Sequence, residues 1–119
     1  MKSYRDLIVW QKSVRLVTIV YEIVSKFPEE ERFGLISQIK RSAVSVPSNI
    51  AEGYGRNYTK DYSRFLQISR GSLYEMQTQF EIASNLKFIE KEDLKEIMSL
   101  SIEVEKMLNT LIKKLKINN

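Results

Sequence analysis

Cysteine and histidine are both absent from the 119 residues of this chain. Without cysteine there is no disulfide framework and no thiolate metal site, and nothing indicates an oxidising compartment, so we expect a cytoplasmic protein. Without histidine the chain lacks the commonest general acid–base residue and the commonest metal ligand. Catalysis would have to rest on carboxylates. We therefore predict that the protein is not an enzyme and that it uses no cofactor or metal.

Glycine and proline are also scarce, with four and two copies, whereas 43% of the residues are hydrophobic and 29% are charged. This balance is typical of amphipathic helices and predicts an all-α protein. No run of 18 apolar residues occurs and the N-terminus lacks the features of a signal peptide, so we expect a soluble protein with no membrane partner. The length predicts a single domain over residues 1–119.

The first helical segment begins near Asp6, a predicted N-cap, and ends at Phe27 and Pro28. It carries two adjacent apolar rows, a wider face than one helix contact requires, so we expect this helix to touch more than one neighbour. One row contains Leu7, Trp10, Val14, Val17, Tyr21 and Val24, and the other contains Leu16, Val20, Ile23 and Phe27.

The second segment, residues 34–55, contains Pro47, which removes a backbone donor and crowds the carbonyl of Ala43 at a cost of about 3 kcal/mol. We predict a kinked helix; the alternative is a helix that ends near Ser45, followed by a short one capped by Asn49. Gly53 and Gly55 are predicted to end the segment in a left-handed conformation. The apolar row is Ile39, Ala43, Val46, Ile50 and Tyr54, and a separate polar row is Arg41, Ser45, Ser48, Glu52 and Arg56.

Two longer segments follow. The third is predicted from the N-cap Thr59 to about Lys87, and Gly71 in its middle predicts that a crossing helix packs close to the backbone. Short connections make neighbouring helices antiparallel, so the pattern predicts an antiparallel up-and-down four-helix bundle with a proline kink in the second helix. The third row is Tyr62, Phe65, Ser69, Leu73, Met76, Phe80, Ala83 and Leu86, and the fourth is Leu94, Ile97, Ser101, Val104, Leu108, Leu111 and Leu115.

The whole net charge of +4 lies between residues 40 and 70, which hold six basic and two acidic residues. Tyr54, Tyr58 and Tyr62 are interleaved with these cations, and such mixtures hold phosphates by charge and bases by stacking. A solvated surface with core tyrosines is the alternative interpretation. The predicted nucleic-acid-binding residues are Lys40, Arg41, Arg56, Lys60, Arg64 and Arg70.

Glu52 and Glu75 are the carboxylates best placed for chemistry, because their neighbours are polar or small. They match no paired metal-binding motif of helical bundles, and Glu52 can instead pair with Arg56 one turn later. Residues 53–56 match neither common phosphate-binding loop, and we interpret them as a turn. A carboxylate-dependent hydrolase is therefore the weakest hypothesis.

Several stretches resemble the four-helix bundle proteins found in 23S rRNA intervening sequences. They are Asp6-Leu7-Ile8-Val9-Trp10-Gln11; Phe27-Pro28 with Glu31 and Gly34-Leu35; Ser45-Val46-Pro47-Ser48-Asn49-Ile50-Ala51-Glu52-Gly53; and Phe65-Leu66 with Arg70-Gly71-Ser72-Leu73. The most specific is the nine-residue block from Ser45 to Gly53, and the resemblance extends over nearly the whole chain.

The resemblance implies a four-helix bundle and a homopentameric ring, since similar proteins assemble in that way. It also implies kinship with basic accessory proteins of diversity-generating retroelements, which engage nucleic acid and a reverse transcriptase. This chain is less basic than those proteins. The residues that the resemblance marks for subunit contact or motif are Arg41, Pro47, Asn49, Glu52, Gly53 and Gly71, together with Arg56 and Arg70.

Two functions remain open from the sequence. The first is a non-catalytic oligomer that binds RNA associated with the ribosome through the basic region. The second is a protein–protein interaction or assembly module without direct nucleic-acid binding, in which Arg41, Glu52 and Arg56 form networks at subunit contacts. No small-molecule substrate is expected in either case.

Overall fold

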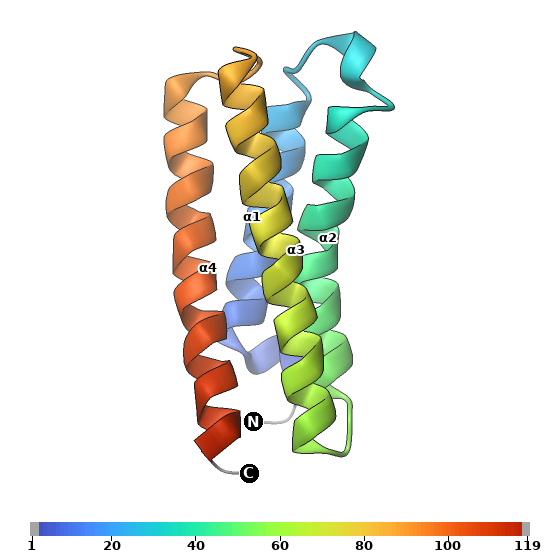
Figure 1. The fold of residues 1–119 in the computed structure, drawn as a ribbon, viewed down its shortest axis with the longest axis vertical. Helices are drawn as coiled ribbons and strands as arrows, with labels where there is room; N and C mark the ends of the chain where they lie inside the picture. Colours follow the sequence, from blue (N-terminus) through green and yellow to red (C-terminus); the bar gives the residue numbers. More distant parts are fainter. Residues whose placement is uncertain (1–2, 118–119) are drawn as a thin grey trace.

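In a computed structural model that describes residues 3–117, four long helices run antiparallel in an up-and-down bundle (Figure 1). They are α1 (Ile8–Val24), α2 (Leu35–Tyr54), α3 (Thr59–Asn85) and α4 (Lys91–Ile117). Short 3-10 turns, Tyr4–Asp6 and Glu29–Glu31, precede α1 and α2. The molecule measures 46 × 23 × 21 Å, and the described chain contains no strand, so the predicted fold class is confirmed.

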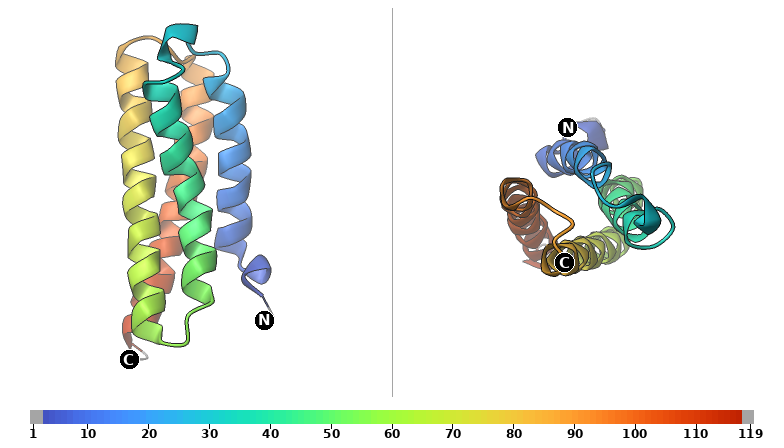
Figure 2. Two further views of the ribbon diagram at one scale, coloured as in Figure 1. Left: turned by 90° about the vertical axis from the view of Figure 1, so that its right-hand side faces the viewer. Right: turned by 90° about the horizontal axis from the view of Figure 1, so that it is seen from above.

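Each helix packs against its two neighbours in chain order, and α4 closes the bundle against α1 (Figure 2). The contact between α2 and α3 is the most extensive of the four. The turn that joins these two helices lies at the same end of the bundle as both termini, and we call it the α2–α3 turn end (Figure 1). None of the described helices is both long and apolar enough to cross a membrane.

The two apolar rows of α1 differ in how far they are buried. The row with Leu16, Val20 and Ile23 faces the core and is buried. In the other row Leu7 and Val24 are buried, whereas Val14 and Tyr21 between them stay 37% and 43% exposed. The helix contacts both α2 and α4, which confirms the expectation of more than one neighbour. A helix of a bundle buries the stripe that faces the bundle axis, and the placement of α2 and α4 decides which row that is.

The predicted core rows of the other helices are largely confirmed. Four members of the α2 row are fully buried, namely Ile39, Ala43, Val46 and Ile50. Leu73, Met76 and Phe80 in α3 and Val104 in α4 are fully buried as well. Leu86 is an exception, because α3 ends at Asn85 and the Leu86 side chain lies 54% exposed.

The helix α2 continues through Pro47 from Leu35 to Tyr54, so the alternative of a break near Ser45 is wrong. The kink itself stays a prediction. The expected left-handed ending is also wrong, because Gly55 has φ −76° and no glycine among the described residues has a positive φ. Thr59 is the first helical residue of α3 and not its cap.

A left-handed residue does end a helix, but in α3. Lys87 has φ 62°, the amide of Phe88 donates to Ala83 O at 2.9 Å, and the amide of Lys87 donates to Ser84 O at 3.0 Å. This pair of hydrogen bonds is the Schellman ending, in which glycine is usual. The lysine adopts it because Phe88 is thereby brought against Phe27, with ring centroids 6.1 Å apart.

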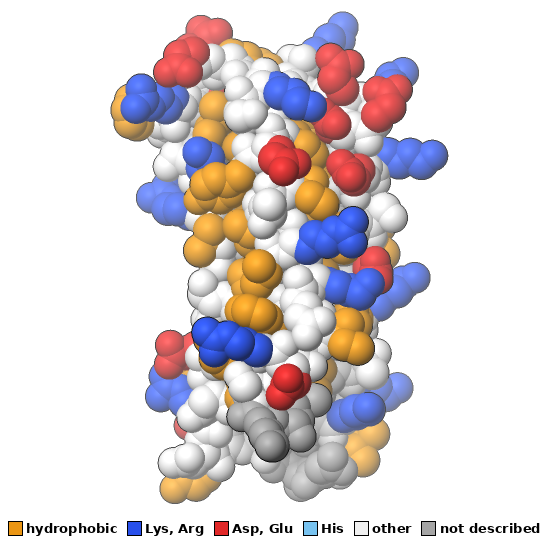
Figure 3. Space-filling view, turned by 180° about the vertical axis from the view of Figure 1, so that it is seen from behind, with side chains coloured by type: hydrophobic (Ala, Val, Ile, Leu, Met, Phe, Trp, Pro, Cys, Tyr) orange, Lys and Arg blue, Asp and Glu red, His pale blue; other side chains and the backbone are white. Residues whose placement is uncertain are grey.

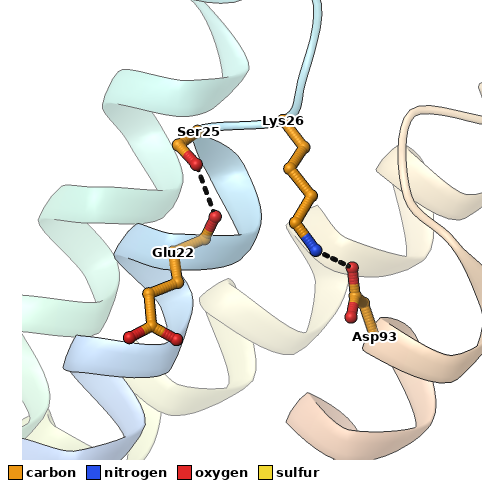
Figure 4. Close-up of polar contacts among 4 residues, drawn as sticks. All are labelled: Glu22, Ser25, Lys26 and Asp93. Atoms are coloured by element: carbon orange, nitrogen blue, oxygen red, sulfur yellow. Dashed lines mark hydrogen bonds and ion pairs between the residues drawn. The ribbon is translucent and has the colours of Figure 1, made fainter.

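Two ion pairs connect α1 and the residues after it with α4. One joins Lys12 to Glu103. In the other, Lys26 Nζ donates to Asp93 Oδ2 at 3.0 Å, while Ser25 Oγ donates to the carbonyl of Glu22 at 2.6 Å and closes the last turn of α1 (Figure 4). The hydrogen bond to Asp93, aided by its charge, raises the pKa of Lys26. These contacts lie at the surface, so they favour a register without contributing much stability.

Candidate functional site

The α2–α3 turn end gathers three of the six predicted nucleic-acid-binding residues. Arg56 follows α2, whereas Lys60 and Arg64 lie one turn apart on α3. The guanidinium carbons of Arg56 and Arg64 lie 4.7 and 4.9 Å from the centre of the Phe65 ring, so one aromatic ring holds two cations. Cation–π contacts of this kind orient a guanidinium. Arg56 uses Nη2 to donate to Glu52 Oε2, and Arg64 makes no hydrogen bond with another described residue.

Aromatic side chains surround these cations. Tyr58, in the turn, is 72% exposed and presents its ring to solvent. Tyr54 and Tyr62 instead pack edge to face with centroids 6.0 Å apart, and burial, with a smaller contribution from Tyr54, raises the pKa of Tyr62 to about 12. One tyrosine is thus free to stack and two hold the turn in place. We call Arg56, Tyr58, Lys60 and Arg64 the turn cluster.

The structure does not bring the other three predicted residues into this cluster, and their role in nucleic-acid binding stays a prediction. Lys40 Nζ lies 4.7 Å above the Tyr21 ring, on the side of α2 that faces α1. Arg70 donates to Asn109 Oδ1 on α4 at 2.8 Å. Arg41 lines a groove between α2 and α3. Residues close in sequence diverge because successive helical positions point about 100° apart.

The nine-residue block from Ser45 to Gly53 has a structural role in this chain. Pro47 is buried and cannot donate to the carbonyl of Ala43. Three consecutive carbonyls beside it accept hydrogen bonds from side chains. Ser48 Oγ donates to Val44 O, Asn49 Nδ2 to Ser45 O, and Ser69 Oγ of α3 to Val46 O, at 2.7, 2.8 and 2.8 Å.

The two glycines that the resemblance marks behave in opposite ways. A Cβ atom on Gly53 would lie 2.8 Å from Phe65 Cβ and 3.0 Å from Tyr62 Cδ1, so only glycine lets α2 and α3 approach this closely. A Cβ on Gly71 would meet nothing within 4 Å. The predicted close approach exists, but at Gly53 and not at Gly71.

The predicted carboxylates are not brought together. Glu52 Oε2 accepts from Arg56 Nη2 at 2.9 Å, which is the i,i+4 pair that the spacing indicates. Glu75 lies in the groove beside Arg41. Over residues 3–117 no group of three acidic side chains is close enough to hold a metal ion.

Sequence reasoning missed the groove that contains Arg41. Its volume is about 370 Å³, and its floor is a hydrogen bond from Ser42 Oγ to Gln79 Oε1 at 2.8 Å, joining two buried residues. The signal that could have found it is the presence of polar residues beside both core rows, at Ser42 next to Ala43 and at Gln79 next to Phe80. The walls are formed by Gln38, Arg41 and Glu75.

These features define an up-and-down four-helix bundle with a basic aromatic cluster at one end and a polar groove on one seam. Residues 5–110 match the family described as 23S rRNA-intervening sequence protein. The chain belongs to this family, which confirms the resemblance. A protein of unknown function from the S23 ribosomal protein family of Bacteroides thetaiotaomicron has a crystal structure similar to this one. It is 25% identical, with a TM-score of 0.83 over 89% of this chain and 96% of that chain. Curated proteins gave no match.

Proposed function

We propose that this protein is a non-catalytic oligomer that binds RNA through the turn cluster. The observation that carries the proposal is the pair of guanidinium groups held on the Phe65 ring, with Lys60 and the exposed Tyr58 beside them. Cations that contact phosphates and a free aromatic ring that stacks on a base are the two components of single-strand recognition. The family description connects such proteins with rRNA, and this supports ribosomal RNA in the cytoplasm as the partner.

A titration with RNA over a range of salt concentrations tests the proposal. Binding should weaken steeply as salt rises, with a log–log slope of about 0.7 per phosphate contacted on a single strand and about 0.9 on a duplex. The variant Lys60→Glu/Arg64→Glu should lose most of the affinity and reduce the slope. Absence of binding by the wild-type protein at about 50 mM salt would refute the proposal.

The matched control is Lys91→Glu/Lys95→Glu. These lysines are also exposed and one turn apart, at the start of α4 and at the opposite end of the bundle (Figure 1). The net charge changes by the same amount in both variants, so general electrostatic attraction is equal. Equal losses of affinity in both would assign binding to total charge and not to the turn cluster.

The oligomer is favoured by a separate observation. Apolar side chains collect along the middle of the face seen from the α1 side (Figure 3). Exposed apolar residues of α1 and α2 include Val14, Tyr21 and Val44, which are 37%, 43% and 40% exposed. Trp10 and Val17 continue the row and are only partly covered. A contiguous apolar strip of this kind marks a protein–protein contact, and we propose that it joins subunits of a homopentamer.

Sedimentation velocity of Val14→Glu tests the assembly. The variant should sediment as a monomer, because a carboxylate would be buried unpaired at each contact. Arg15→Glu, at an exposed position about 100° away from Val14 around the same helix, should leave the oligomer intact. If Lys60→Glu/Arg64→Glu disassembles the protein, the turn cluster belongs to a subunit contact and the function is that of an assembly module.

A further inference from the structure

The groove between α2 and α3 is a polar site with unused hydrogen-bonding groups. Gln79 is 7% exposed, and its Oε1 accepts from Ser42 while its amide nitrogen makes no hydrogen bond with any described residue. Among the described residues no buried side-chain nitrogen or oxygen lacks a hydrogen-bond partner, so this nitrogen is reached by solvent and can donate to water or to a ligand. Gln79 is one of the residues that line the groove, so its amide supplies a hydrogen-bond donor to the site.

The two walls carry opposite charges. Arg41 on α2 and Glu75 on α3 both line the groove, but within residues 3–117 neither side chain forms an ion pair. The site therefore presents N–H donors from Arg41 on α2 and from Gln79 on α3, and two carboxylate acceptor atoms from Glu75, one turn before Gln79 on α3. A volume of about 370 Å³ falls in the range of small-ligand sites.

Among nucleobases this arrangement favours one. Guanine has the acceptor O6 next to the donors N1–H and N2–H₂ on one edge. A carboxylate can accept hydrogen bonds from the two donors, while O6 accepts a hydrogen bond from Arg41 or Gln79. Adenine and cytosine each place an acceptor nitrogen beside their amino group, and this acceptor would face a carboxylate oxygen. Uracil offers a single N–H between two acceptors.

The groove also lies on a path from the turn cluster. Arg41 precedes Arg56 by 15 residues, which is about 22 Å along a helix. Between them, Ser45 and Ser72 share a hydrogen bond of 2.8 Å across the seam and a Cβ on Gly71 would meet nothing within 4 Å. The exposed side chains of Glu52 and Ile68 also lie on this path. Gly71 is one turn before Glu75 and shares its face.

We infer that the groove formed by Gln38, Arg41, Glu75 and Gln79 binds an unpaired guanine of the RNA strand held at the turn cluster. This inference rests on the RNA-binding function proposed above. Sequence-specific RNA recognition reads the edges of unstacked bases in single-stranded regions. The turn cluster then supplies affinity for phosphates, and the groove supplies preference for a base.

Fluorescence anisotropy with labelled 12-nucleotide oligouridylates tests the inference. One oligonucleotide carries a single central guanosine, and others carry adenosine, cytidine, inosine or uridine at that position. The guanosine strand should bind roughly tenfold more tightly than the others, because one well-made bidentate contact discriminates by about that factor. Inosine, which lacks the 2-amino group, should lose most of the preference.

The variant Glu75→Gln should abolish the preference while leaving the affinity for all-uridine RNA unchanged. Its control is Glu81→Gln, an exposed glutamate on the same helix, which should bind like the wild type. Preference that persists in Glu75→Gln overturns the inference, and so does a change of oligomeric state in that variant, because the groove would then be a subunit contact. Free GMP that competes as strongly as the guanosine strand also overturns it.

Failure of this inference and failure of the proposed function give different results. Equal binding of all five oligonucleotides removes the guanine site and leaves RNA binding at the turn cluster intact. Binding of none of them removes both. A loss of all RNA affinity in Glu75→Gln would likewise contradict a site that contributes only preference.

Discussion

The α2–α3 seam and the α1–α4 seam hold the same bundle together in different ways. Across the first, small residues and hydrogen bonds dominate: Gly53 admits Phe65, Ser42 bonds to Gln79, and Ser69 bonds to a backbone carbonyl. Across the second, surface ion pairs flank an aliphatic core. A close, hydrogen-bonded seam permits one register, whereas an aliphatic seam tolerates changes of shape that keep its volume.

The largest effect is expected on the aliphatic side, where Leu108 of α4 is fully buried. Leu108→Ala should lower the free energy of unfolding by about 2–5 kcal/mol, because it removes apolar contacts and leaves a cavity. Leu108→Met, which nearly keeps the volume, should cost less than about 1.5 kcal/mol. Urea denaturation measures both. A small loss in Leu108→Ala would show that α4 can collapse onto its neighbours.

On the close seam, Gly53→Ala should lower the free energy of unfolding by about 1–3 kcal/mol, since the new Cβ atom meets Phe65 Cβ at 2.8 Å and forces the helices apart. Gly71→Ala is the matched control. It should stabilise the protein by about 1 kcal/mol, because alanine favours the helix and meets nothing there. If both variants shift the free energy of unfolding in the same direction, the close approach of α2 and α3 at Gly53 does not set this seam apart.

Alkaline pH should also weaken the close seam. The pKa of Tyr62 is raised to about 12 from its usual 10, so the folded state favours the neutral phenol. This contribution is complete below pH 10 and is lost between pH 10 and 12. Because Tyr62 is only partly buried, the loss should be smaller than the roughly 2.7 kcal/mol equivalent to two pKa units. Thermal melts should show that the melting temperature of the wild type falls more steeply with pH across this range than that of Tyr62→Phe.

A smaller loss is expected for Ser69→Ala. Its buried hydroxyl donates to Val46 O at 2.8 Å, and removal of one such hydrogen bond costs about 1 kcal/mol. Ser48→Ala removes a hydrogen bond that an exposed serine makes within α2, and should change stability by less than about 0.5 kcal/mol. Chemical denaturation distinguishes them. Equal effects would mean that hydrogen bonds across the seam add nothing to those within a helix.

The smallest effect belongs to the ion pair between Lys12 and Glu103. The two side chains are 35% and 48% exposed, so Lys12→Gln should cost less than about 1 kcal/mol. The loss should shrink further at about 1 M salt, where charges are screened within about 3 Å. A double-mutant cycle with Glu103→Gln measures the pair directly. A coupling above 1 kcal/mol would place this ion pair among the main determinants of the α1–α4 seam.

How far the sequence predicts the candidate site depends on the kind of residue. The pair of Lys60 and Arg64 follows from helical spacing alone, as does the pair of Glu52 and Arg56. The position of Arg70 against Asn109 does not, because the two residues are 39 positions apart and meet only when α3 packs on α4. The groove with Gln79 depends likewise on the approach of α2 to α3.

Periodicity and composition by themselves determined that the chain is all-α, that it has four helices, and which rows of α2, α3 and α4 are apolar, because these properties depend on contacts within one or two turns. Tertiary structure decided which row of α1 is buried, which glycine admits a neighbour and which cations share a surface. Gly53 and Gly71 are the same residue in the same kind of helix, and only the position of the next helix gives them opposite roles.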